Sequence, residues 1–279
     1  MKARILNELH VQSMSEFDAK QEIDRRITFL ANTLQSSGLN AYVLGVSGGV
    51  DSSAAARLAQ LAVEKLRSTG YDAFFVAVRL PYGTQLDESD AQAALDYICP
   101  DHVHTVNIQA AADALHNDVV SGMHGLRGLR GLCEQGCGEL DFAKGNVKAR
   151  QRMVAQYEIA GLLGGLVIGT DHNAEAVMGF YTKFGDGACD VTPLVGLNKR
   201  QVRLIAKTLG LPKALYTKAP TADLESEKPQ LLDEDVLMVT YDEIDDYLEG
   251  ISIPEKSARR IENQFLATAH KRAMPIKPD

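Results

Sequence analysis

The chain has 279 residues, of which 45% are hydrophobic and 24% are charged, a composition typical of a globular protein. Its formal net charge of −8 argues against a general nucleic-acid-binding surface and against binding to anionic membranes. No apolar run is long enough for a membrane-spanning helix and the first residues lack a signal-peptide core, so we expect a cytoplasmic protein that contacts neither membranes nor nucleic acids.

Taken in chain order, apolar runs rich in β-branched residues alternate with stretches of helical periodicity. The predicted strands cover 41–46, 73–80, 103–108, 165–169 and 191–197. The predicted helices cover 16–36, 52–66, 86–98, 146–163, 199–209, 233–248 and 254–270. Because crossovers join strands that alternate with helices, we predict a doubly wound, Rossmann-like α/β fold with a parallel sheet covered by helices on both faces. Such sheets bind ligands beyond the carboxyl ends of the strands, where the strand order reverses.

Two segments interrupt this alternation. Residues 122–145 contain seven glycines and no amphipathic period, which predicts a mobile surface loop or a poorly ordered insertion. Residues 218–234 contain two prolines and seven charged side chains, which predicts a loop that becomes ordered when a ligand binds.

The motif GVSGGVDSS at 45–53 lies between the first predicted strand and the helix that follows it. Its glycines permit a tight turn and let backbone amides approach an anion, and the helix N-terminus attracts the same anion. The residues that we expect to bind phosphate groups are Gly45, Ser47, Gly48, Gly49, Asp51 and Ser52. A carboxylate beside phosphates is repelled unless a cation bridges them, so Asp51 predicts a bound Mg²⁺. The alternative is a plain glycine turn in which Asp51 or Ser52 caps the helix.

This motif lacks the lysine that follows the glycines in kinase-like nucleotide-binding loops. It resembles the PP-loop signature of ATP pyrophosphatases, which cleave ATP between the α and β phosphates and have an adenine nucleotide alpha hydrolase-like fold. The signature alone leaves open guanylate synthetase, argininosuccinate synthetase and tRNA-modifying enzymes.

Further strings narrow the resemblance. They are RLPYGTQLDE (79–88), GNVKARQRM (145–153), the long string at 169–203, KAPTADL (218–224) and the His270–Lys271–Arg272 triplet. Together, and over nearly the whole chain, they resemble the ammonia-dependent NAD synthetase family. The resemblance implies ATP-dependent amidation of deamido-NAD (nicotinic acid adenine dinucleotide), the last step of NAD biosynthesis, through an acyl-adenylate that gives NAD, AMP and pyrophosphate. It also implies one NAD synthetase domain over 1–279, with no glutaminase domain and with free ammonia as the nitrogen donor.

The family pattern implies further contacts with ATP, which acts as co-substrate. The residues concerned are Thr170, Lys199 and Thr221, with Arg79 and Gln85 on the adenine side. Asp51 and Lys199 are implied to act in catalysis, and Asp51 and Glu175 to bind Mg²⁺. Glu175 follows the predicted strand 165–169, so it should reach the same crevice as Asp51. The alternatives are a helix-dipole carboxylate for Glu175 and a solvated surface position for Lys199.

The same resemblance implies a second set of residues that bind deamido-NAD. They are Arg150, Lys183, Asp190, His270 and Lys271. The resemblance also implies a homodimer, for which Ile159, Leu162 and Leu163 offer apolar surface on the helix that carries Arg150. Considered singly, Arg150 is typical of an exposed helix face and His270 of a helix end.

The chain departs from the family pattern at the variable position of the phosphate motif, where Val50 replaces the expected glutamine. We expect this side chain to point away from the phosphates. Two alternative functions are a guanylate-synthetase-type ligase, which would need its own dimerisation domain, and a non-catalytic nucleotide sensor. A sensor would need the phosphate motif but neither Glu175 nor Lys199.

Overall fold

The computed structural model describes residues 1–84, 88–123, 138–222, 231–275 and 277–278. Its central sheet is parallel throughout and has the strand order β3-β2-β1-β4. The strands are β1 (Ala41–Gly45), β2 (Phe74–Arg79), β3 (His102–Thr105) and β4 (Gly165–Val167). The predicted doubly wound α/β fold is therefore confirmed. The strand order reverses between β1 and β4, and ligands of such sheets bind at this reversal.

The helices of the first two thirds of the chain are α1 (Lys2–Glu8), α2 (Ala19–Ser37), α3 (Val50–Ser68), α4 (Glu88–Ile98), α5 (Gln109–Gly122), α7 (Gly138–Leu163) and α8 (Asn173–Met178). Those that follow are α9 (Lys199–Leu209), α10 (Lys213–Tyr216), α11 (Asp233–Leu237), α12 (Tyr241–Leu248), α13 (Glu255–Ala267) and α14 (Ala269–Arg272). Within the described ranges, no helix combines the length and the apolar character needed to cross a bilayer.

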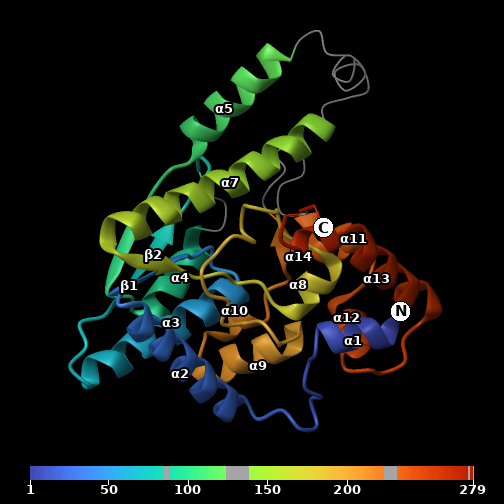
Figure 1. Ribbon diagram of the computed structural model, residues 1–279, viewed down its shortest axis with the longest axis horizontal. Coiled ribbons are helices and arrows are strands. Elements are labelled where there is room, and N and C mark those ends of the chain that lie inside the picture. Colours follow the sequence, from blue (N-terminus) through green and yellow to red (C-terminus); the bar gives the residue numbers. More distant parts are fainter. Residues whose placement is uncertain (85–87, 124–137, 223–230, 276, 279) are drawn as a thin grey trace.

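Alternate residues of the strands face two separate hydrophobic clusters, as the period of a strand requires. Tyr42 and Leu44 of β1 pack in a cluster with side chains of α2, α3 and α9. Val43 of the same strand packs on the other face, with Val76 of β2 and Ala160 of α7. Helices therefore bury both faces of the sheet, while α5 and α7 extend past its edge (Figure 1).

A third hydrophobic cluster joins the two ends of the chain. Ile5 of α1 packs with Val177 of α8, Ile244 of α12 and Phe265 of α13. The N-terminus and the C-terminal helices consequently lie on the same side of the molecule (Figure 1). This cluster supports α8, which follows β4 at the strand reversal.

Two predictions of regular structure are wrong. The predicted strand at 191–197 contributes only a single bridge between Val191 and Ile168, because Pro193 cannot donate to a ladder and Gly196 has a φ of +84°. The predicted helix at 233–248 is two helices, α11 and α12. Met238 ends α11 with a φ of +58°, and Thr240 starts α12 with a capping box.

The two predicted loops are partly regular. Residues 138–145 belong to α7, so the loop prediction fails there, and 124–137 lie outside the described residues. The sequence did not predict α5, where Ala112 is the buried residue, so no apolar stripe marks the helix. In the second segment, β5 (Thr221–Ala222) pairs antiparallel with β6 (Leu231–Leu232), and 223–230 lie outside the described residues.

Candidate active site

The turn between β1 and α3 has the backbone that the glycine motif predicts. Gly48 has a φ of +91°, and a Cβ atom there would lie 2.7 Å from the backbone nitrogen of Ala91. Gly49 is the N-cap of α3 and offers no side-chain cap, so the helix amides keep their capacity for an anion. The Oγ atoms of Ser47 and Ser52 lie 3.1 Å apart at the same turn. Neither Asp51 nor Ser52 caps the helix, which disfavours the plain-turn alternative.

Asp51 forms an ion pair with Lys199 in the crevice. Lys199 Nζ lies 2.7 Å from Asp51 Oδ2, and Lys199 is only 1% exposed. The capping box of Asn198 and Gln201 starts α9 at this position, and the backbone N–H of Lys199 donates to Asp245 at 3.0 Å. The structure therefore rules out the surface position for Lys199 that the sequence left open.

Glu175 and His172 complete a cluster around this ion pair. His172 Nε2 lies 3.4 Å from Asp51 Oδ1 and 3.5 Å from Glu175 Oε1, and the ligand atoms of the three residues all lie within 4.8 Å of one another. Among the described residues, no group donates a hydrogen bond to the buried Asp51 Oδ1. Paired carboxylates with an unpartnered buried oxygen fit a divalent cation that prefers oxygen ligands.

Burial and neighbouring charge shift the titration of these groups. Burial alone would raise the pKa of Asp51, but Lys199 and His172 outweigh it and hold the pKa well below its usual range. Burial raises the pKa of Glu175 to about 8, with the charges of Asp51 and Asp171 adding to it and those of His172 and Lys199 opposing it. Burial lowers the pKa of Lys199, and the nearby carboxylates of Asp51 and Glu175 raise it by more. At neutral pH the cluster therefore holds an ionised Asp51, a charged Lys199 and a protonated Glu175.

Hydrogen bonds connect the segments that carry four of the five residues predicted for the second substrate, and Asp190 makes separate contacts. The Arg150 guanidinium of α7 donates to the carbonyl of Lys183 at 3.3 Å, and Lys183 Nζ donates to the carbonyl of His270 at 2.6 Å. Lys271 Nζ donates to the carbonyl of Tyr181 at 2.6 Å. Asp190 accepts from the Val167 N–H at 2.7 Å and from the Tyr157 hydroxyl at 3.3 Å. Contacts thus link α7, the 181–184 segment and α14.

The remaining residues predicted to contact ATP differ in their surroundings. Thr170 is partly buried just after β4, and Thr221 begins β5. Arg79 is 4% exposed and pairs with Glu88 at 3.0 Å, while Gln85 lies outside the described residues. Val50 is buried in the hydrophobic cluster that contains side chains of α2 and α9, a position consistent with the expectation that it points away from the phosphates.

Sequence reasoning missed three residues that shape the cluster. His172 lies within the string at 169–203, but the sequence analysis gives it no role, although it follows the same predicted strand as Glu175. The Tyr241 ring lies under Lys199 Nζ at 4.7 Å, and Asp245 anchors the start of α9. Tyr241 and Asp245 come from α12, and no sequence signal indicates that α12 packs against α9.

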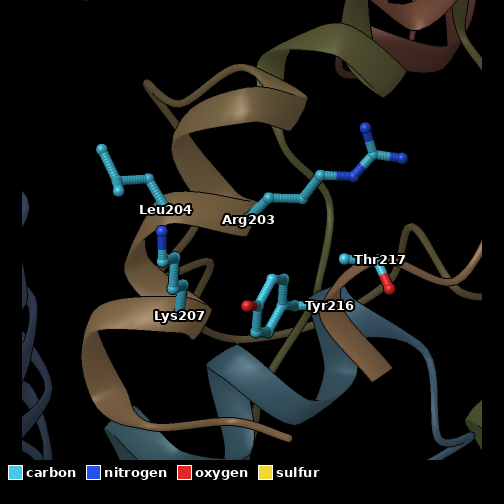
Figure 2. A pocket seen from close by; sticks show the side chains of 5 residues that line it. All are labelled: Arg203, Leu204, Lys207, Tyr216 and Thr217. Carbon is cyan, nitrogen blue, oxygen red and sulfur yellow. The ribbon is translucent and has the colours of Figure 1, made fainter. Parts of the chain in front are cut away.

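A separate hollow of about 350 Å³ lies beside α9 and α10, lined by Arg203, Leu204, Lys207, Tyr216 and Thr217. Figure 2 shows the head groups of Arg203 and Lys207 directed to different sides, so the two cations do not converge on one point. None of the residues predicted for the site lines this hollow. The catalytic interpretation therefore rests on the cluster at the strand reversal.

Comparison with known proteins decides the family. The family model described as NAD synthase matches residues 22–275, a range that includes every predicted site residue from Gly45 to Lys271. The chain belongs to the NAD synthase family. It is 54% identical to an NH₃-dependent NAD⁺ synthetase of Paraburkholderia phytofirmans, over 99% of this chain and 93% of the relative. It is 52% identical to the protein of the same name from Streptomyces coelicolor, over 100% of this chain and 97% of the relative.

Two solved structures resemble the chain over nearly its full length. The NAD⁺ synthetase of Burkholderia pseudomallei has a TM-score of 0.81 and 50% identity, covering 98% of this chain and 96% of its own. The NMN synthetase of Francisella tularensis has a TM-score of 0.78 and 33% identity, covering 95% of this chain and 100% of its own. These matches support the NAD synthetase interpretation and not the guanylate-synthetase or sensor alternatives.

Proposed function

We propose that this chain is an ammonia-dependent NAD synthetase, which converts deamido-NAD, ATP and ammonia into NAD, AMP and pyrophosphate. The observation that carries the proposal is the buried Asp51–Lys199 ion pair beside the glycine turn, with Glu175 next to it at the strand reversal. A protein that only senses a nucleotide needs the glycine turn but has no use for a buried lysine and two carboxylates beside it. An enzyme that activates a carboxylate with ATP needs both the turn and these charged side chains.

The phosphate-binding role falls to the turn and the start of α3. The 45–53 backbone and the Ser47 and Ser52 hydroxyls receive the triphosphate, and Thr170 and Thr221 border it. Asp51 and Glu175 would hold Mg²⁺, which supplies charge neutralisation on the phosphates when bound. Lys199 adds a second positive charge at the same point, which would stabilise the negative charge that develops on the leaving pyrophosphate.

In this proposal the reaction proceeds in two steps, adenylation and then amidation. A carboxylate oxygen of deamido-NAD attacks the α-phosphorus of ATP, the bond to the β-phosphate oxygen breaks, and pyrophosphate leaves. The nitrogen lone pair of ammonia next attacks the acyl carbon, the bond from that carbon to the AMP oxygen breaks, and the nitrogen loses a proton as the amide forms. The relatives named NH₃-dependent NAD⁺ synthetases support ammonia as the nitrogen donor. We propose that residues 1–279 form a single catalytic unit.

Deamido-NAD binds, in this proposal, along the group formed by Arg150, Lys183, Asp190, His270 and Lys271. The group is supported by its linked contacts and by the exposure of Arg150. Its cations suit the pyrophosphate and carboxylate of the dinucleotide, and Asp190 suits a ribose hydroxyl.

We further propose a homodimer formed through α7 and α5. Leu162 of α7 is 76% exposed, Val154 is 51% exposed, and Val119 of α5 is 49% exposed. Ile159 packs inward on the sheet, so Leu162 and Leu163 remain as the apolar surface named from the sequence. Exposed apolar side chains on this scale are typical of an interface. Sedimentation should give twice the chain mass, and Leu162→Asp should shift the protein to the monomer.

The function is tested by following all products at once. Purified protein with Mg²⁺, ATP, deamido-NAD and ammonium chloride should form NAD, AMP and pyrophosphate in equal amounts. Replacing ammonium by glutamine should leave only background turnover. Equal rates with both nitrogen sources, in protein free of contaminating glutaminase, would contradict the proposal.

The substrate is tested by a direct comparison, because the Francisella relative is named an NMN synthetase. Nicotinic acid mononucleotide should be amidated much less efficiently than deamido-NAD, judged by kcat/KM. The higher identity to NAD synthetases supports this order. A preference for the mononucleotide would place the chain with the Francisella protein instead.

A further inference from the structure

Asp245 of α12 holds the backbone of the buried Lys199. The backbone N–H of Lys199 donates to Asp245 Oδ1 at 3.0 Å, and the backbone N–H of Arg200 donates to Oδ2 at 2.8 Å. Asp245 is only 1% exposed. A carboxylate that accepts from two backbone N–H groups at a helix N-terminus makes charge-assisted bonds and is favoured by the helix dipole. The start of α9 is therefore fixed to α12 at the residue that carries the buried ammonium group.

Helix α9 also has a cap of its own. The Asn198 side chain accepts from the backbone N–H of Gln201 at 3.0 Å, and the Gln201 side chain accepts from the backbone N–H of Asn198 at 3.1 Å. A capping box of this kind leaves the first two amides of the helix, here those of Lys199 and Arg200, to find other partners. Asp245 therefore adds a contact beyond the local cap, at the residue that enters the cluster.

The same helix contacts the other end of Lys199. Tyr241 lies one turn before Asp245 on α12, so the two side chains share one face of that helix. The Tyr241 ring lies 4.7 Å from Lys199 Nζ, which in turn lies 2.7 Å from Asp51 Oδ2. A cation is attracted to the face of an aromatic ring, so Tyr241 supports the ammonium group where it meets Asp51.

Helix α12 is itself held by the hydrophobic core. Ile244, Tyr247 and Leu248 pack in the cluster that joins the two ends of the chain, and the capping box of Thr240 starts the helix. A functional side chain is placed more precisely when its supports lie on such a packed element than when they lie on a loop.

We infer that Asp245 is a positioning residue for the proposed reaction, because it fixes the backbone of Lys199 so that the ammonium group meets Asp51 and the departing pyrophosphate. Asp245 acts through Lys199. A displacement of about 1 Å caused by a mutation away from the chemistry can cost roughly 100-fold in rate. The inference rests on the proposed function in that it requires Lys199 to take part in the reaction.

The experiment is a double-mutant cycle. Asp245→Asn, which keeps the shape of the side chain but turns an NH₂ group toward one of the two backbone N–H groups, is made in the wild-type chain and in Lys199→Met. Adenylation of deamido-NAD is followed in single turnovers with radiolabelled ATP, so that slow variants remain measurable. We expect the rate to fall by about 10- to 100-fold in the wild-type background, with both KM values unchanged, and not to fall further in Lys199→Met.

The matched control is Asp246→Asn. This neighbouring carboxylate on α12 pairs with the guanidinium group of Arg200 at 2.8 Å, so it contacts the side chain of α9 and not the backbone of Lys199. Its replacement should leave the adenylation rate unchanged in both backgrounds. Circular dichroism verifies that each variant is folded. If Asp245→Asn does not fold, Asp245→Glu, which displaces the carboxylate by one methylene group, takes its place in the cycle with the same expectation.

An equal loss of rate in the wild-type and Lys199→Met backgrounds would mean that Asp245 does not act through Lys199, and would overturn the inference. A folded Asp245→Asn variant with the wild-type rate would overturn it as well. Hydrogen exchange of the wild type checks the contact independently, since the amides of Lys199 and Arg200 should exchange slowly, and exchange as fast as at an open helix end would contradict the inference. A wild type that forms NAD but gives an additive cycle contradicts only this inference, whereas one that forms no NAD contradicts the proposed function.

Discussion

The buried cluster at the strand reversal and the exposed group around Arg150 differ in what their cations contact. Lys199 is paired with the carboxylate of Asp51, while Lys183 and Lys271 donate to backbone carbonyls. A carbonyl is neutral, so these hydrogen bonds do not neutralise the positive charge of either lysine. Burial lowers the pKa of Lys271, and the nearby carboxylates of Asp186 and Asp171 oppose that shift. In the Asp51–Lys199 pair at the strand reversal, the two charges already neutralise each other. We therefore assign this pair to the reaction and not to substrate binding. We therefore expect changes in the cluster to alter rate and stability, and changes in the exposed group to alter substrate affinity.

The sharpest test of this difference is Asp51→Asn. The amide keeps the size of the side chain but removes the charge that pairs with Lys199 and holds the cation. We expect kcat to fall by about 1000-fold while the affinity for ATP changes little, since the turn and helix amides remain. Steady-state kinetics and ATP binding by calorimetry measure the two effects. Asp24→Asn on the exposed face of α2 is the control, and wild-type turnover in Asp51→Asn would reduce Asp51 to a structural residue.

Lys199→Met tests the stability side of the comparison. It leaves the buried Asp51 without its partner, and removing one member of a buried ion pair typically destabilises a protein by about 3 kcal/mol. Lys271→Met removes hydrogen bonds to carbonyls from a partly exposed side chain, and we expect a loss of about 1 kcal/mol. Urea unfolding of both variants gives the free energies. Equal losses would mean that the two regions do not differ as described.

The pH dependence of metal binding tests the protonated Glu175. Its pKa is raised to about 8, so a proton competes with the cation below that pH and is absent above it. We expect Mn²⁺ affinity to rise by up to about tenfold per pH unit from pH 6.5 to 8 and then to level off. Asp51, whose pKa is lowered, stays ionised throughout this range. In Glu175→Gln binding should be weaker and flat with pH, and a slope that persists there would assign the proton to another group.

Arg150→Ala tests the exposed group and should have the smallest effect. Loss of one charge-assisted contact corresponds to roughly a tenfold increase in the KM for deamido-NAD. The KM for ATP should stay the same, because Lys199 and the glycine turn serve the phosphates of ATP. Arg259→Ala, on the exposed face of α13, is the control. A variant impaired only toward ATP would mean that the dinucleotide lies elsewhere.

The convergence of Asp51 and Glu175 could be predicted from the sequence because each follows a buried strand. Parallel strands place their carboxyl ends at one edge, so two such positions meet without any knowledge of the packing. The phosphate turn was predictable for a similar reason, since its glycines and the following helix are local features.

The roles of His172 and Tyr241 could not be predicted in this way. Tyr241 reaches the cluster because α12 packs against α9, and that contact depends on side-chain packing between segments that are distant in the chain. Helix α8 has only six residues and an unusual histidine cap, so it leaves little periodicity to detect. The apolar run at 191–197 predicts a full strand, but the structure has only a single bridge at Val191, because apolar character alone does not determine where pairing ends.

The turn after β1 also determines how freely its own sequence can vary. A Cβ atom at Gly48 would meet the backbone of α4, which cannot yield as a flexible side chain does, so even alanine should be depleted there in a saturation library selected for growth. Two residues later, Val50 is surrounded by core side chains, and other apolar residues of similar volume should survive the same selection. We therefore expect position 50 of the motif to accept several residues and position 48 to accept only glycine.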